Sequence, residues 1–331
     1  VITITDMSEL FNEALAFNQD ISAWTVDNVE NMEAIFAQSS FDQPIGGWTV
    51  TNVQTMESMF AETPFNQDLS TWVTSSLSNT DSMFANATLF NQDISGWDVS
   101  GVDNMQGMFL NAEAFNQPIG SWIVSSAINM EGMFSNADAF NQPIGNWLVG
   151  NVENMSGMFT NAVSFNQDIG MWNVSMVTDM SNMFNGATAF NQNLNLWNVT
   201  LVEDMSAMFS GAEVFNGNIT SWVTTSLMLM PNMFNGAKLF NQDIGNWTTS
   251  SVVNMRELFT GAEVFDQDIG GWDVSMVSDM ENMFSGAQLS IDNYDALLIG
   301  WQASGVQNGI LFNGGTSTYC NGASARDTLI N

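Results

Sequence analysis

The sequence has almost no positive charge. Its 331 residues include 3 Lys and Arg, 35 Asp and Glu and no His, which gives a formal net charge of −32. Binding to a phosphate backbone or to an anionic membrane surface needs clustered basic residues, and three cannot provide such a surface. The absence of His excludes His-dependent catalytic triads and His-ligated zinc. We therefore expect no nucleic-acid partner.

Cysteine and long apolar runs are also scarce. Cys320 is the single cysteine, so no internal disulfide can form. No uninterrupted apolar run is long enough to cross a bilayer, so we expect no membrane insertion, and no signal peptide is recognisable. Hydrophobic residues nevertheless make up 45% of the chain, with 24 Phe, 24 Met and 12 Trp. This composition predicts a folded protein with a substantial core.

An internal repeat dominates the sequence. A phenylalanine opens each unit, at intervals of 24 residues for the first two steps and 25 thereafter, and a tryptophan follows seven residues later. The opening residues are Phe17, Phe41, Phe65, Phe90, Phe115, Phe140, Phe165, Phe190, Phe215, Phe240 and Phe265. A fixed period of this length predicts a solenoid, in which each coil shields the apolar face of its neighbour.

Two shorter patterns alternate within each unit. Apolar residues between Val102 and Ala112 recur at i, i+3, i+6, i+7 and i+10, which predicts a short helix. Ser100 followed by Asp103 resembles a helix start, and Asn111 suits a left-handed helix end. The alternation across 97–99 predicts one short strand per unit, paired in parallel between coils. The fold class is thus an α/β, right-handed parallel solenoid with one strand and one helix per repeat.

The two ends depart from the repeat. Residues 1–287 form the predicted solenoid, with a partial first coil over 1–16, where Val1, Ile4 and Met7 match later core positions. Residues 288–331 form a predicted capping or docking module. It contains a helical stripe at Tyr294, Leu297, Leu298 and Trp301, preceded by Asp292 as the cap, and a hairpin around residues 313–315.

Amide side chains form a recurrent column. Asn follows the opening Phe in nine of eleven units, with Asp42 and Asp266 as the exceptions, and Gln usually follows it. The pattern favours an inward ladder of amides that satisfies backbone groups of the turns between coils. A groove for a polar ligand is the alternative.

Two further columns are candidate sites for metal ions and glycans. A stacked carboxylate column could hold Ca²⁺, although prolines interrupt it. Its members are Asp20, Asp68, Asp93, Asp168, Asp243 and Asp268. Asn-x-Ser/Thr sequons are candidate glycosylation sites. They occur at Asn86, Asn173, Asn198, Asn218 and Asn246, and a sixth, at Asn154, falls in another column of the repeat. No other cofactor is expected.

The repeat phrases resemble a known family. Phe90-Asn-Gln-Asp-Ile-Ser-Gly-Trp-Asp-Val-Ser100 and Asn104-Met-Gln-Gly-Met-Phe109 are similar to the repeat of BspA-like bacterial surface proteins, which are related to leucine-rich-repeat proteins. The resemblance covers residues 1 to about 287. It implies an extracellular or cell-surface location and a role in adhesion or assembly, without catalytic residues.

The sequence offers little for catalysis. Its carboxylates belong to repeating columns rather than to a singular cleft, and no His lies near Cys320 to activate it. We expect an extracellular structural or adhesive protein. Self-association head to tail through the first coil and the C-terminal module is one hypothesis for its assembly, and a monomeric rod is the alternative. Attached glycans are a further hypothesis. The alternative function is a binding module for a polysaccharide or protein ligand. A polysaccharide-binding module would be expected to expose its tryptophans to solvent.

Overall fold

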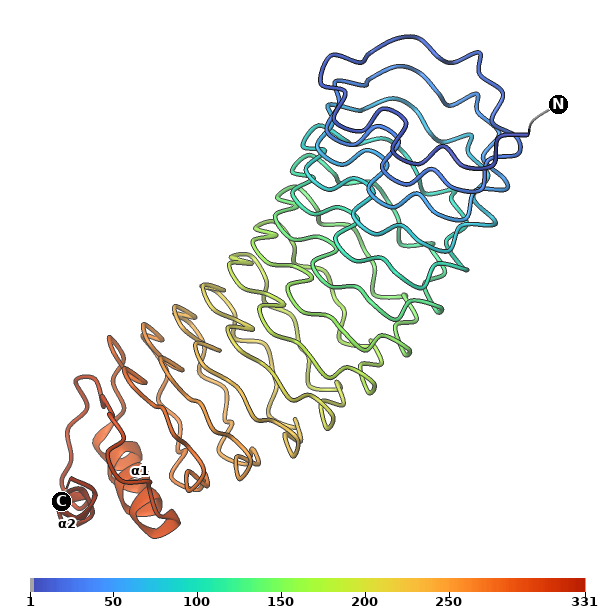
Figure 1. Ribbon diagram of the computed structural model, residues 1–331. Helices are drawn as coiled ribbons and strands as arrows, with labels where there is room; N and C mark the ends of the chain where they lie inside the picture. Colours follow the sequence, from blue (N-terminus) through green and yellow to red (C-terminus); the bar gives the residue numbers. More distant parts are fainter. Residues whose placement is uncertain (1–2, 331) are drawn as a thin grey trace. The chain divides into compact units, whose positions relative to one another are not determined.

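The computed structural model describes residues 3–330 and shows coil stacked upon coil (Figure 1). The chain forms two compact units, one ending at Asp168 and the other beginning at Ile169. Among residues 3–330 the only α-helices are α1, Ile291–Ser304, and α2, Ala323–Leu329. Neither is long and apolar enough to cross a bilayer. The prediction of a solenoid of stacked coils is confirmed, but the predicted helix in each coil is not.

Neighbouring coils pair in parallel through single bridges rather than through extended strands. In the first unit one column of bridges runs through Asp6, Asn31, Thr55, Asn79, Asn104, Asn129 and Asn154. In the second unit it runs through Asp179, Asp204, Leu229, Asn254 and Asp279. The parallel direction is as predicted, but the strand predicted at 97–99 is wrong. That segment shows only the alternating burial of a strand, because Trp97 and Val99 are buried and Asp98 is exposed.

Consecutive tight turns replace the helix predicted over 102–112. The amides of Met108, Leu110 and Ala112 donate to carbonyls three residues back, at 3.3, 2.9 and 3.1 Å. The intervening amides donate to the next coil, as Gly107 does to the Glu131 carbonyl at 2.8 Å. The helix prediction is wrong because alternate amides are used between coils. Both arrangements turn apolar residues with this spacing inward.

Two positions in each coil have the left-handed backbone that such turns need. In the illustrated coil they are Gly107, with φ of 53°, and Asn111, with φ of 56°. The left-handed conformation predicted for Asn111 is therefore confirmed, although it closes a turn rather than a helix. Ser100 does not cap a helix either, because its amide and hydroxyl both donate to the Asp98 carboxylate.

Stacked aromatic rings form the core of each unit. Phe109 is fully buried and lies 3.9 Å from Phe115, measured between ring centroids, and 5.8 and 5.6 Å from Phe84 and Phe134 of the adjoining coils. The tryptophans add a polar ladder, since the indole Nε1 of most of them donates to a carbonyl of the preceding coil. Trp272, for example, donates to Ile244 at 3.1 Å. The repeat-opening and Trp positions are therefore structural.

Trp247 breaks this ladder and supplies a test of it. Its buried Nε1 finds no acceptor within the described part of the chain. Replacement of Trp by Phe removes a similar amount of apolar ring surface at Trp247 and at Trp272. Only Trp272→Phe also removes a hydrogen bond. We expect Trp272→Phe to lower the free energy of unfolding by about 1 kcal/mol more than Trp247→Phe. Urea denaturation of both variants measures the difference; equal losses would contradict the ladder's contribution.

The first described coil has a neighbouring coil on one side only. Met7 is buried like its counterparts, but Ile4 is 61% exposed, so its assignment to the core is wrong. Trp24 is 42% exposed, whereas later repeat tryptophans are buried. Val1 lies outside the described residues.

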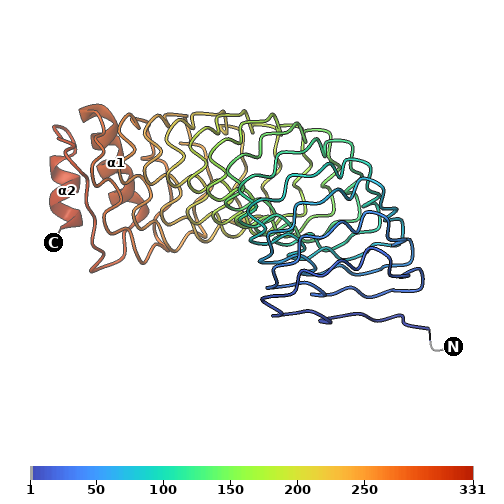
Figure 2. The ribbon, with the colours of Figure 1, turned by 90° about the horizontal axis from the view of Figure 1, so that it is seen from above.

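The C-terminal module departs from the prediction in three details. Ser290, not Asp292, caps α1, because its hydroxyl accepts from the Asn293 amide. The hairpin around 313–315 is absent from the described residues, and Phe312 instead pairs in parallel with Met280 of the last coil. Helix α2, which packs against α1 (Figure 2), was not predicted. The predicted stripe is confirmed, since Tyr294, Leu297, Leu298 and Trp301 are all buried.

A buried carboxylate holds the start of α2 against α1. The side chain of Asp295 accepts from the amides of Cys320, Asn321 and Gly322 at 2.7 to 2.9 Å. Burial opposes ionisation, but these three hydrogen bonds outweigh it and lower the pKa of Asp295. The module therefore rests on one ionised side chain that the repeat pattern does not reveal.

Where the module covers the last coil, it makes the same kinds of hydrogen bond that a further coil would make. Trp301 Nε1 donates to the Ile269 carbonyl at 3.3 Å, as repeat tryptophans do one coil earlier. Asn293 Nδ2 donates to the side chain of Asp266 at 2.8 Å, as repeat glutamines do. Helix α1 thus satisfies the polar groups of the last coil. The division of the chain at residue 287 itself stays a prediction.

Candidate functional site

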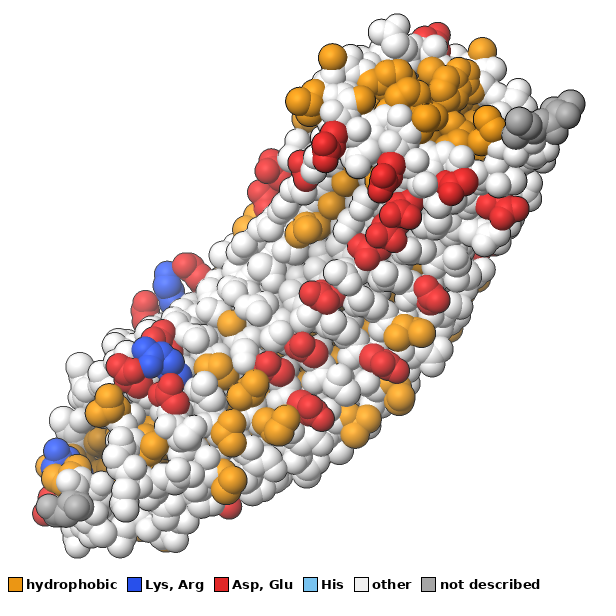
Figure 3. Space-filling model, in the orientation of Figure 1, with side chains coloured by type: hydrophobic (Ala, Val, Ile, Leu, Met, Phe, Trp, Pro, Cys, Tyr) orange, Lys and Arg blue, Asp and Glu red, His pale blue; other side chains and the backbone are white. Residues whose placement is uncertain are grey.

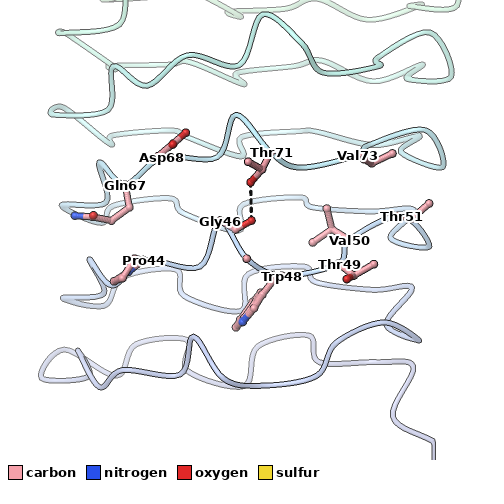
Figure 4. Close-up of a pocket in the computed structure, with 11 residues that line it drawn as sticks. Pro44, Gly46, Trp48, Thr49, Val50, Thr51, Gln67, Asp68, Thr71 and Val73 are labelled. Carbon is pink, nitrogen blue, oxygen red and sulfur yellow. Dashed lines mark hydrogen bonds between the residues drawn. The ribbon is translucent and has the colours of Figure 1, made fainter.

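A shallow groove of about 610 Å³ lies on the outer face of the first unit (Figure 4). It lies between 44–51 of one coil and 67–73 of the next. Trp48 contributes to its lining although the ring is only 3% exposed, and exposed Thr49, Asp68 and Thr71 surround it. The groove is therefore polar at its rim and supported by the aromatic core.

Two adjacent glycines create the groove. A Cβ on Gly46 would lie 2.6 Å from the Asp68 carbonyl, so this position needs glycine for the close approach of the coils. A Cβ on Gly47 would meet nothing within 4 Å, so its missing side chain leaves space open to solvent. Figure 4 shows Thr71 directed at Gly46, whose carbonyl accepts from the threonine hydroxyl at 2.7 Å. Sequence reasoning missed this site, although Gly-Gly-Trp distinguishes it from most units.

The groove can bind but has no paired acid and base. Its one ionisable side chain is Asp68, which accepts from the Ser70 amide at 2.8 Å. Hydrogen bonds from the Ser70 side chain and amide lower the pKa of Asp68, so it is an anionic acceptor at neutral pH. Gln67 is held by the amide ladder through a 2.8 Å bond to Asp42. Hydroxyl, amide and carboxylate groups here suit hydrogen bonding to a partner.

A column of exposed side chains continues from the groove along the outer face. We call the residues directly after each Trp the outer column. In the first unit it includes Val73, Ile123 and Leu148, which are 56%, 60% and 69% exposed. In the second unit it includes Asn173, Asn198 and Val223, all exposed. Apolar side chains this exposed do not contribute to the core, so the column is a candidate contact surface.

The hydrogen bonds of the predicted amide ladder are confirmed, but its predicted inward orientation is wrong. Asn91 Oδ1 accepts from the Asn116 amide at 3.0 Å and from Gln117 Nε2 at 2.8 Å, and equivalent bonds recur along both units. Asp42 accepts in the same way from the following coil. Only an acceptor oxygen is needed, which explains why Asp can replace Asn. The ladder lies at the surface, partly exposed.

The predicted calcium column acts locally in turns. Five of its carboxylates each accept from the amide two residues ahead, at 2.8 to 3.0 Å: Asp20, Asp68, Asp93, Asp243 and Asp268. The sixth, Asp168, is exposed. Within residues 3–330 no three acidic or cysteine side chains gather in a group that could hold a metal ion. Calcium binding therefore stays a prediction.

The sequons differ in accessibility. Asn86, Asn173, Asn198 and Asn246 are exposed, whereas Asn218 and Asn154 are half-buried. Asn154 also donates to Glu131 at 3.0 Å within the repeat pattern. Asn173 and Asn198 belong to the outer column. Their use as glycosylation sites stays a prediction.

A second acidic column follows the bridge residues of the first unit. Burial raises the pKa of Glu57, and the neighbouring charges of Glu33 and Asp81 add to the effect, against a hydrogen bond from Asn79. Acidic side chains are prominent on the face shown in Figure 3. In the first unit, the carboxylates of Glu33, Glu57 and Asp81 thus bring negative charges of successive coils close together.

Glu57 supplies a pH-dependent test. Its folded pKa lies above the ordinary value of 4.5, so the folded state binds the proton more tightly and loses stability as pH rises through this window. We expect Glu57→Gln to stabilise the protein by about 0.5 kcal/mol at pH 7, a small value because the side chain is partly solvated. The gain should vanish near pH 3.

Urea denaturation at both pH values measures this effect. Glu113→Gln, which removes one exposed carboxylate of the same unit, is the control for net charge. The same gain in both variants would show that overall charge, rather than the stacked column, is responsible.

Comparisons with known proteins agree with the repeat. The family model described as "Mycoplasma protein of unknown function, DUF285" matches residues 1–94, 62–162, 140–237 and 217–309. Among solved structures, an internalin from Listeria monocytogenes is similar, with 11% identity and a TM-score of 0.24, over 99% of this chain and 85% of that chain. A TM-score this low does not establish a common architecture. No curated protein matches the chain.

Proposed function

The chain belongs to the family described as "Mycoplasma protein of unknown function, DUF285", and we propose that it is an extracellular or cell-surface adhesive repeat protein. In this proposal it is a binding and structural protein rather than an enzyme. Its outer column and the Gly46–Gly47 groove contact the partner. A protein surface is the favoured partner.

The single observation that carries the proposal is the group of exposed apolar side chains within the outer column, which also holds polar residues such as Thr49 and Asp98. Ile123 and Leu148 occupy consecutive coils, and Val73, in the same column, also lines the groove. Exposed apolar side chains close to polar groups are typical of contact surfaces between proteins. Repetition along a coil stack allows one partner to be held at several points.

Burial of the tryptophans favours a protein over a polysaccharide partner. Trp48, Trp97 and Trp122 are at most 4% exposed, so they offer no aromatic platform for sugars. The carboxylates of the coils support a non-enzymatic role, because they belong to columns with one side chain per coil. General acid–base catalysis needs groups that converge on one substrate.

An adhesion assay tests the proposal. Beads coated with the protein are applied to cultured epithelial cells and to bacterial cells, and retention under flow is measured. Ile123→Asp with Leu148→Asp should reduce retention at least about tenfold, since it places charge in the contact surface. The matched control is Leu89→Asp, an equally exposed apolar residue outside the outer column.

Two results would refute this role. One is wild-type retention no greater than that of uncoated beads. The other is an equal loss in the control and the column variant. Near-ultraviolet circular dichroism of each variant establishes that its core is intact.

The proposal has three finer parts. The first is that the protein is BspA-like, which the repeat phrases support. The second is head-to-tail assembly through the first coil and the C-terminal module. The third is glycosylation at exposed sequons. Electron microscopy of native material tests assembly, with dispersed single particles against it, and intact mass tests glycans, with a bare-chain mass against them.

A further inference from the structure

A second cavity, of about 910 Å³, lies in the C-terminal part of the second unit. It is lined by residues of the last coil, α1, the loop 305–314 and α2. Figures 1 and 2 show where the two helices lie. Its walls combine polar and apolar side chains. The apolar ones include Met280, Leu297, Leu298, Trp301, Phe312 and Leu329. The volume is that of a small-molecule site.

The charge of this cavity is opposite to that of the chain. None of its described lining residues is Asp or Glu, although the chain has 35 of them. Arg326, one of only 3 basic residues, lines it from α2. The nearest ion-pair contact of this guanidinium is long, 3.9 Å from Nη1 to Asp327 Oδ1, which exceeds a hydrogen bond. Arg326 therefore retains donors for an anionic ligand.

One aromatic ring lies against the guanidinium, and a second is close enough to be affected by its charge. The Arg326 side chain lies 5.2 Å from the centre of the Tyr319 ring, a cation–π arrangement. Tyr294 also lines the cavity. Burial raises the pKa of Tyr294, and the positive charge of Arg326 opposes this rise. The Tyr294 hydroxyl stays protonated at neutral pH and is a second possible donor.

We propose that this cavity binds a free fatty acid, with the hydrocarbon chain against the apolar walls and the carboxylate on Arg326. A chain with a net charge of −32 repels carboxylates over most of its surface. Recognition of an anionic amphiphile therefore requires a local site that combines apolar walls with a guanidinium, free of acidic side chains. The site is separate from the outer column and goes beyond the adhesive function.

Calorimetric titration with dodecanoate and with dodecanol tests the proposal. Both share the hydrocarbon chain, but only dodecanoate carries the carboxylate. Arg326→Gln should weaken dodecanoate binding at least about tenfold and leave dodecanol binding unchanged. The control is Lys238→Gln, which removes a basic residue outside the cavity, paired with Glu213 at 2.9 Å. It should leave both affinities unchanged.

Hydrogen exchange locates the ligand. Dodecanoate should slow amide exchange in the loop 305–314 and in α2, and Ile310→Asp, which puts a carboxylate on the cavity wall, should abolish the effect. The proposal is overturned if dodecanoate does not bind, if the protected amides lie elsewhere, or if Arg326→Gln and Lys238→Gln weaken binding equally. Unchanged exchange in the unliganded Arg326→Gln protein shows that the module remains folded.

Discussion

Replacing Phe109 by Ala should lower the free energy of unfolding by about 3–5 kcal/mol, the range for a large buried aromatic residue. The ring is fully buried, and it stacks on Phe115 within its coil and on Phe84 and Phe134 in the coils on either side. Its loss leaves a cavity that a close-packed stack cannot collapse to fill. Urea denaturation measures the change.

The matched control is Leu89→Ala. Leu89 is 57% exposed, so its truncation should change the free energy of unfolding by less than about 0.5 kcal/mol. Similar losses in the two variants would mean that the phenylalanine rows do not form the core of the stack.

Replacing Gly120 by Ala should have the second large effect. The added Cβ would lie 2.1 Å from the Pro143 carbonyl of the next coil, and this backbone oxygen cannot move without separating the coils. We expect a loss of about 1–3 kcal/mol, as for overpacked interiors. Thermal unfolding followed by near-ultraviolet circular dichroism measures it.

Gly96 is the control for this substitution. A Cβ there would meet nothing within 4 Å, so Gly96→Ala should be nearly neutral. If the two alanine variants unfold at the same temperature, the close approach of coils at Gly120 does not limit the packing.

The sequence predicts those parts of the fold that depend on periodic burial. The Phe and Trp columns, the amide ladder and the apolar stripe of α1 could all be predicted, because their side chains recur at fixed spacing. Parallel stacking follows from the constant length of the repeat. Predicting these features does not require the hydrogen-bond partners of individual backbone amides.

The predicted helix failed because backbone partners are not local. An apolar spacing of three and four residues is shared by a helix and by consecutive turns, and the difference is that Met105 donates to Asn129 in the next coil. A left-handed residue four positions before Asn111 could have indicated turns, and Gly107 occupies that place. The same column holds Ala34 and Glu257, which obscure the pattern.

The groove and the C-terminal cavity depend on non-repeating residues. The groove arises where Gly46 and Gly47 coincide with the gap between two coils. The cavity depends on α2, which Asp295 fixes through amides 25 to 27 residues away. Single contacts of this kind leave no periodic pattern in the sequence.

Deletion of one complete repeat tests the central claim, that the coils are interchangeable units stacked in register. Removing residues 115–139 joins Ala114 to Phe140 and restores every column of the repeat. Near-ultraviolet circular dichroism during heating should show intact aromatic packing and cooperative unfolding, whereas removal of 115–126 alone should abolish both. Loss of aromatic packing on removal of the complete repeat would contradict the claim.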